Sequence, residues 1–452
     1  MTFTQALVTS DDLPGPDTVV TIPEGALKAE LITGAPLEFD LTTPSANVMT
    51  QLVKVDNMAL RLHGQPTDFD IEHSGGKVKL AGNTLPPIPI EGSLNSAGGA
   101  LIGQAKARLP QADNTPITMT YNIRDGAGYA DVDIEALHFT PDGLQPQNLI
   151  KALRGKVAQV DGMASAKVRL EFARDKPMKS SGTAKIINMN LGTAPGPLTG
   201  MNMELSMDSV LPLVSRGRQR ITVASFDPGI PLKDGVIDFE LIDDGVKIYD
   251  AKWPLGDGFF SLDPFVWSYG TDENRLTMRL SDVELGQFLE SMGNDSIQAT
   301  GKLQGTFPIV ISGVNLRVEK GEIGVKDGGV IRFRPAEADG SQPESFTQDE
   351  ALNILRTKDQ ARYGSLARDV LREFNYQELS VKVDGALDGE VELGTVFTGS
   401  NSKVLNGQPF EFDINVIGEL FNIIRSFDSN EHILSQLEKQ GISTEGLAVG
   451  DE

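Results

Sequence analysis

With 452 residues the chain is longer than one compact core, so it predicts either several domains or one repetitive body. Its formal net charge of -23 argues against nucleic acid as a partner and against broad electrostatic docking on a membrane, because both surfaces are anionic. It has no cysteine, so disulfides and thiolate metal sites are excluded.

The beginning of the chain carries no visible export signal. The first twenty residues lack the basic and apolar regions of a secretory signal. The longest uncharged stretch, Ile186–Met203, is interrupted by glycine and proline and does not predict a membrane-spanning helix. If the natural protein is anchored in a membrane, we expect the anchor to precede Met1.

Alternation of apolar and polar residues recurs along the chain and predicts half-buried strands. In Ala166–Phe172 four apolar side chains share one face, and Lys, Arg and Glu share the other. The same pattern is found in Leu37–Leu41, Leu60–His63, Phe69–Ile71, Ile237–Leu241, Leu379–Val383, Val391–Leu393 and Phe410–Val416. Each of these strands is therefore predicted to have one face exposed to solvent.

The apolar faces of such strands either close on a second sheet, as in a sandwich, or line an open groove. The pattern does not separate the two, but many aliphatic and few aromatic residues favour a groove for acyl chains. We predict a mainly β fold, an elongated and curled antiparallel sheet (a β-taco) whose apolar groove covers 1–345 and continues through 376–417. The candidate lining residues are Val168, Leu170, Phe172, Ile237, Phe239, Leu241, Val381, Val383, Val391, Leu393, Phe412 and Ile414.

Two segments near the C-terminus have helical spacing instead. Thr347–Glu350 is a capping-box sequence, and the apolar residues after it predict an amphipathic helix within 346–375, interrupted near Gly364. Glu419–Gln440 repeats the helical period, so 418–452 is predicted to be a terminal helix and a frayed tail.

No pattern of residues predicts a catalytic, metal or cofactor site. Asp125–Asp133 resembles a calcium loop, but two of its positions lack the oxygen ligands that such a loop needs. There is no nucleophile elbow or phosphate-binding motif, and acidic residues lie at alternate strand positions rather than converging. No two histidines are spaced for one metal, so we expect all four on the surface or at strand ends: His63, His73, His138 and His432. The sequence therefore predicts no enzyme.

Several motifs of the last third occur in an order typical of one protein family. They are Leu276–Phe288, Ile297–Ile309, Val318–Ile323, Gly328–Phe333, Leu371–Tyr376 and Gly399–Phe427. On these motifs, the chain from about Leu149 to Phe427 resembles the YdbH-like family of the AsmA-like and TamB-like envelope proteins. This group is related in architecture to bridge-like lipid transfer proteins. The turn at Ser402 departs from the family, which usually has proline there.

The resemblance implies intermembrane phospholipid transport in the periplasm, with acyl chains shielded in the groove. It also implies an inner-membrane anchor missing from this chain and an outer-membrane lipoprotein partner, for which the strand edge near Phe410–Val416 is the expected pairing site. A charge at Phe239 or Val383 is expected to block lipid occupancy and spare the fold. The alternatives are a structural or adhesive β-sandwich and a carbohydrate-active β enzyme.

Overall fold

The computed structural model is mainly β, with antiparallel strand pairing and a few short helices, which confirms the predicted class at that level. Within the predicted terminal helix and tail, 418–452, residues 418 and 419 end a strand, and the rest lies outside the described residues. Those extend from 2 to 419 without 4–5, 9–18, 31–36, 50–52, 66–67, 81–82, 85–89, 98–99, 110–114, 125–126, 150–152, 155–156, 174–175, 194–195, 211, 229, 292–296, 314, 334–345, 358–359 and 388.

The chain divides into two compact units, and unit 1 comprises Met1–Thr193, Leu198–Thr222 and Phe239–Asp244. Its first elements are β1 (Thr2–Phe3), β2 (Ala6–Val8), β3 (Val19–Ile22), β4 (Gly25–Glu30), β5 (Glu38–Met49), β6 (Val53–Gln65), β7 (Asp68–Leu80), β8 (Asn83–Thr84) and β9 (Ile90–Ala97). They are followed by β10 (Ala100–Leu109), β11 (Thr115–Arg124), β12 (Ala127–Phe139), α1 (Pro146–Leu149), β13 (Ala158–Ala173), β14 (Lys176–Thr193) and β16 (Val214–Ser215). Strands β15 (Gly196–Ser209), β17 (Gln219–Phe226) and β18 (Leu232–Ile242) have residues in both units.

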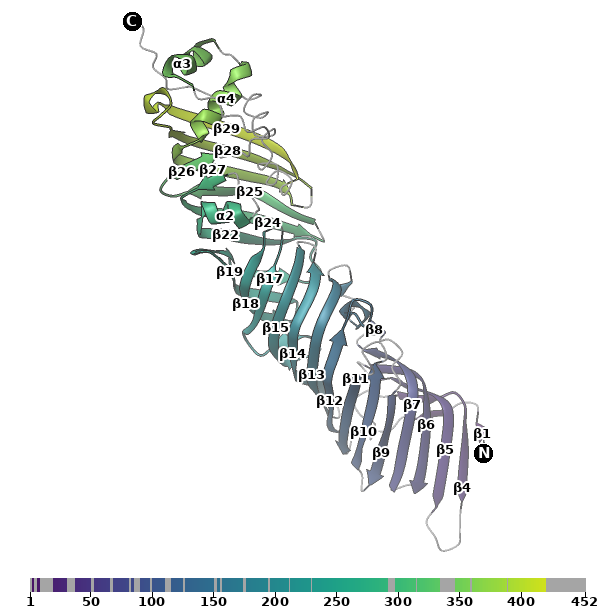
Figure 1. Cartoon of the computed structure of the whole chain (residues 1–452). Helices are drawn as coiled ribbons and strands as arrows, with labels where there is room; N and C mark the ends of the chain where they lie inside the picture. The colour runs from purple at the N-terminus through teal and green to yellow at the C-terminus, as the bar shows by residue number, and fades with distance from the viewer. Residues whose placement is uncertain are drawn as a thin grey trace. The chain divides into compact units, whose positions relative to one another are not determined.

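Strands β4 to β14 form an up-and-down meander, shown in purple to teal in Figure 1. Apart from the two-residue β8, each strand pairs antiparallel with the next one along the chain. Successive side chains of a strand point to alternate faces, and directly paired residues of neighbouring strands point to the same face. The alternation within each strand therefore adds up to one continuous face of the sheet.

Bulges interrupt this ladder at residues with left-handed backbone conformation. Asn57 (φ 59°) donates its backbone N–H to Oδ1 of Asn47 at 3.0 Å. Asn188 (φ 48°) donates its backbone N–H to Oδ1 of Asn202 at 2.9 Å. Asparagine tolerates this conformation better than most residues, and the neighbouring amide replaces the ladder hydrogen bond that the bulge removes.

Unit 2 comprises Ala194–Pro197, Val223–Asp238 and Gly245–Glu452. Its strands are β19 (Gly245–Leu255), β20 (Gly258–Leu262), β21 (Phe265–Ser268), β22 (Asn274–Glu284), β23 (Ile297–Ala299), β24 (Lys302–Ser312), β25 (Asn315–Val325), β26 (Gly329–Phe333), β27 (Phe374–Ala386), β28 (Glu390–Ser400) and β29 (Pro409–Glu419). Its helices are α2 (Leu285–Ser291), α3 (Gln348–Thr357), α4 (Gln360–Leu371) and the 3-10 helix η3 (Leu405–Gly407).

The helices of unit 2 are insertions that leave the strand ladder continuous. β22 pairs with β24 across the insertion of α2, and β25 pairs with β27 across the insertion of α3 and α4. Both α3 and α4 lie beside β27, β28 and β29 in Figure 1, and their apolar residues share one buried cluster with those strands. No helix among the described residues has the length and apolarity needed to cross a membrane.

Helices α3 and α4 occupy the segment where the sequence predicts one amphipathic helix. The capping box forms, because Thr347 donates its backbone N–H at 2.9 Å and its hydroxyl at 2.7 Å to the Glu350 carboxylate. The predicted interruption near Gly364 is wrong. Gly364 lies inside α4, and α3 ends at Thr357 instead.

Candidate functional site

Strands β5 to β13 of unit 1 share one apolar face, which we define by two adjacent cross-strand rows. The first row is Leu41, Leu62, Ile71, Leu94, Gly103, Tyr121, Ala130 and Leu170. The second row is Thr43, Leu60, His73, Gly92, Ala105, Met119, Val132 and Val168. Neither row contains an acidic residue, a lysine or an arginine, so the face is suited to hydrocarbon.

Most large side chains of this apolar face are only half-buried. This holds for Leu62, Ile71, Leu94, Val132 and Leu170. In a sandwich, a second sheet would remove such side chains from solvent almost completely. Half-burial over consecutive strands favours a face that remains open on one side.

The corresponding side chains of unit 2 are packed into a closed core. Phe374 is fully buried at 0% exposure and Phe412 at 1%. The Phe412 ring stacks on the Phe397 ring with centroids 4.8 Å apart, and both meet the Phe374 ring edge-on at 5.4 and 5.7 Å. Ile354 of α3 and Leu366 of α4 belong to the same buried cluster, so these helices cover this part of the sheet.

The predicted lining residues fall into separate groups, one in each unit. In unit 1, Val168 and Leu170 are half-buried, whereas three are buried: Phe172 (9%), Phe239 (4%) and Leu241 (8%). In unit 2, Ile237 and Val381 are half-buried, whereas five are buried: Val383 (4%), Val391 (1%), Leu393 (7%), Phe412 (1%) and Ile414 (8%). Only Val168 and Leu170 lie in the two rows of the apolar face.

This burial changes the expected result of charging Phe239 or Val383. With 4% exposure each, these positions would remove most of a new charged side chain from water. A charge there is expected to destabilise the fold itself, so the loss of lipid could not be separated from unfolding. Val168, which is half-buried, is a better position for this test.

The opposite face of unit 1 is polar and carries cross-strand ion pairs. Arg169 donates two hydrogen bonds of 2.7 Å to the Asp131 carboxylate, and its guanidinium lies 4.5 Å from the ring centroid of Tyr129. Arg61 binds the Asp40 carboxylate in the same two-pronged way at 3.1 Å. These exposed pairs fix register more than they add stability.

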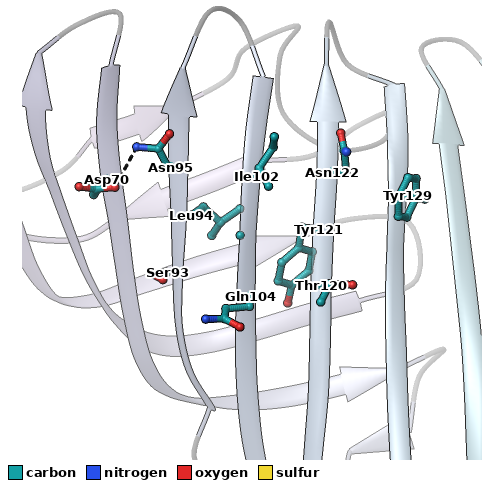
Figure 2. Close-up of a pocket in the computed structure, with 11 residues that line it drawn as sticks. Asp70, Ser93, Leu94, Asn95, Ile102, Gln104, Thr120, Tyr121, Asn122 and Tyr129 are labelled. Atoms are coloured by element: carbon teal, nitrogen blue, oxygen red, sulfur yellow. Dashed lines mark hydrogen bonds between the residues drawn. The ribbon is translucent and has the colours of Figure 1, made fainter.

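A shallow hollow of about 450 Å³ in unit 1 is lined mostly by residues of the polar face, together with Leu94, Gly103 and Tyr121 of the first row (Figure 2). Asp70, Asn95 and Asn122 line it, and Asn95 donates a 3.1 Å hydrogen bond to Asp70. Ile102 stands between the two asparagines and is 55% exposed. Most of its side chains are amides and hydroxyls, so it does not suit an acyl chain.

The described carboxyl groups with a shifted pKa differ from the general acid of a glycoside hydrolase. A general acid of that chemistry needs a carboxyl group with a raised pKa. Hydrogen bonding to a neighbouring cation lowers the pKa of Asp131, Glu204 and Glu373, and hydrogen bonding to Thr347 lowers the pKa of Glu350. These four shifts all stabilise the ionised form, so they favour a structural role.

His73 is half-buried in the middle of β7, so the expectation of an exposed or strand-end position is wrong for this residue. It stands in the second row of the apolar face, paired with Leu60 on one side and Gly92 on the other. Its Nδ1 atom is buried and has no hydrogen-bond partner in the structure. Burial lowers the pKa of the imidazole below its usual value of 6.5, so the ring is neutral at pH 7.

The free energy of unfolding is expected to fall as the pH drops below about 6.5. In this range His73 is protonated in the unfolded chain but resists protonation in the folded one. The unfolded state then binds more protons, which favours unfolding. Thermal unfolding between about pH 7.5 and 5.5 tests this. His73→Phe should flatten the pH dependence, whereas His138→Phe, at an exposed position of β12, should not. The same slope in both variants would contradict the assignment.

One protein-family model matches residues 20–442, and this family is described as YdbH-like, intermembrane phospholipid transport protein YdbH. Neither the curated proteins nor the solved structures contained a match to the chain. The family match covers most of the 452 residues. The chain therefore belongs to the YdbH-like family, which places it among the intermembrane phospholipid transport proteins of the cell envelope and not among enzymes.

Proposed function

We propose that the protein carries phospholipid between the two membranes with the acyl chains on the apolar face of unit 1 and the headgroups in solvent. The half-burial of that face supports this proposal most directly. Each methylene group transferred from water to an apolar surface gains about 0.8 kcal/mol. The affinity for an acyl chain that lies along several strands therefore grows with the length of the chain. A headgroup at the open side keeps its hydration and costs little.

A face of near-uniform apolarity gives the cargo similar affinity at successive strands. An acyl chain can therefore shift from row to row without exposure to water. Net direction then follows from supply of lipid at one end and removal at the other, rather than from a gradient of affinity. We propose that the elongated, curled sheet predicted from the sequence provides this continuous path.

The buried core of unit 2 supports a different role for its helical end. Because α3 and α4 cover β27 to β29, hydrocarbon cannot reach Phe412 or Phe374 without displacing them. We propose that cargo binds the face of β5 to β13 and not the space beneath these helices.

The outer-membrane lipoprotein partner implied by the family resemblance is proposed to pair with β29. This strand has β28 along one edge, and Ile417 on it is 69% exposed. A strand edge with exposed apolar side chains favours addition of a further strand. Anchoring in the inner membrane, which the family resemblance implies, is part of the same proposal.

Purification without detergent, followed by native mass spectrometry and lipid extraction, tests the proposed function. We expect phospholipid to copurify with the full chain in a defined ratio, because its acyl chains are shielded from water. A structural or adhesive β protein would carry none. A lipid-free protein, both as purified and after incubation with phospholipid vesicles, would contradict the proposal.

A further inference from the structure

We propose that His73 on β7 and Tyr121 on β11 mark a station for the glycerol ester groups of a bound lipid on the apolar face of unit 1. This inference rests on the proposed function and adds the part of the lipid that the face recognises. It assigns hydrogen-bonding roles to two side chains that an acyl chain alone does not need.

The floor between His73 and Tyr121 is made of small residues. Gly92 on β9 and Ala105 on β10 follow His73 in the same cross-strand row. A Cβ atom at Gly92 would lie 2.6 Å from Nε2 of His73 and 2.7 Å from Cβ of Ala105. The imidazole therefore occupies the space over Gly92 that a side chain there would take. With strands about 4.8 Å apart, β7 and β11 are separated by roughly 14 Å, which leaves room for a glycerol unit.

Each ring carries a polar atom that lacks a good hydrogen-bond partner in the described part of the chain. The Tyr121 hydroxyl contacts Sδ of Met119 at 3.5 Å, and a thioether is a weak acceptor. In Figure 2 the Tyr121 ring runs along its strand, which brings the hydroxyl toward the row that contains His73. Nδ1 of His73 is buried without a partner, and an unsatisfied buried group of this kind calls for an occupant.

The surroundings select a neutral acceptor over a charged one. Burial alone lowers the pKa of His73 and raises the pKa of Tyr121, and no ionised group contributes to either shift. A phosphate at this position would leave its charge among apolar side chains without a cation, which is costly. Ester carbonyl oxygens are the neutral acceptors of a phospholipid, and they lie directly beside its acyl chains. A half-turn of the imidazole about its Cβ–Cγ bond would present Nδ1 to such an oxygen.

A competition between ester-linked and ether-linked phosphatidylethanolamine tests this station, because the ether lipid keeps both chains but lacks the carbonyl oxygens. The full chain is incubated with vesicles containing equal amounts of the two lipids, re-isolated, and its bound lipid quantified by mass spectrometry. We expect the wild type to prefer the ester lipid about threefold to tenfold, as one hydrogen bond allows. The His73→Phe/Tyr121→Phe double variant should lose this preference and bind the two lipids in equal amounts.

Two further variants keep this test decisive. Tyr121→Phe alone retains the ring and should lower the preference partly. Tyr129→Phe is the matched control, because Tyr129 lies on the polar face of the next strand and should retain the wild-type preference. A wild type that is fully loaded but shows no preference would overturn the station and leave the proposed function intact. A wild type that binds neither lipid would overturn both.

Discussion

Val168→Glu is expected to lower the phospholipid that copurifies with the protein at least about tenfold, because an unpaired carboxylate would stand where an acyl chain lies. Val168 is half-buried and pairs with Val132 on one side and Gly182 on the other. Because this position is half-buried, the new carboxylate can turn toward solvent, so the fold is expected to survive. Lipid extraction, together with the thermal midpoint of the same sample, measures both effects.

Thr183→Glu is the matched control for this charge. Thr183 is exposed, lies on the next strand and pairs with Lys167 on the polar face. The same carboxylate should therefore leave lipid content unchanged there. Equal lipid in the wild type, Val168→Glu and Thr183→Glu proteins, all folded, would show that acyl chains do not occupy the apolar face.

Phe374→Ala is expected to lower the free energy of unfolding of unit 2 by about 3–5 kcal/mol. Phe374 has 0% exposure and makes edge contacts with the rings of Phe397 and Phe412, so alanine would leave a cavity beneath α3 and α4. Hydrogen exchange of β27 to β29 in urea measures the change. Unit 1 should keep its protection, because the cavity lies in unit 2.

Phe259→Ala is the control for loss of an aromatic ring outside this core. Phe259 is half-buried, and its ring lies under the ammonium group of Lys252 at 3.5 Å. We expect a loss of about 1 kcal/mol, since little buried area is removed. Similar losses for Phe374→Ala and Phe259→Ala would mean that the helices do not close a packed core.

The sequence predicts the two faces of unit 1 well, because alternation within a strand is local information. In Ala166–Phe172 the apolar residues form one face of β13, and Arg169 and Lys167 on the other face pair with Asp131 and Asp133. The position of His73 is also available from sequence, since it follows Ile71 by two residues and so shares its face. Classing it with surface histidines ignored that alternation.

The sequence does not predict which elements pack on a face of the sheet, because that depends on residues far apart in the chain. Val168 and Val383 sit in equally alternating strands, yet one is half-buried and the other has 4% exposure. Val383 belongs to the buried cluster of unit 2, where side chains from strands and helices far apart in the sequence pack together. Gly364 lies inside α4, although its low intrinsic helix propensity disfavours that position.

Site-specific photo-crosslinking at Leu101 and Ile102 tests the central claim most directly. These neighbours on β10 are both aliphatic but face opposite sides: Leu101 is half-buried in the row next to Gly103 and Tyr121, and Ile102 is 55% exposed on the polar face. We expect a benzophenone side chain at 101 to capture phospholipid acyl chains and one at 102 to capture none. Equal capture at both positions, or capture at 102 alone, would contradict the placement of the cargo on the apolar face.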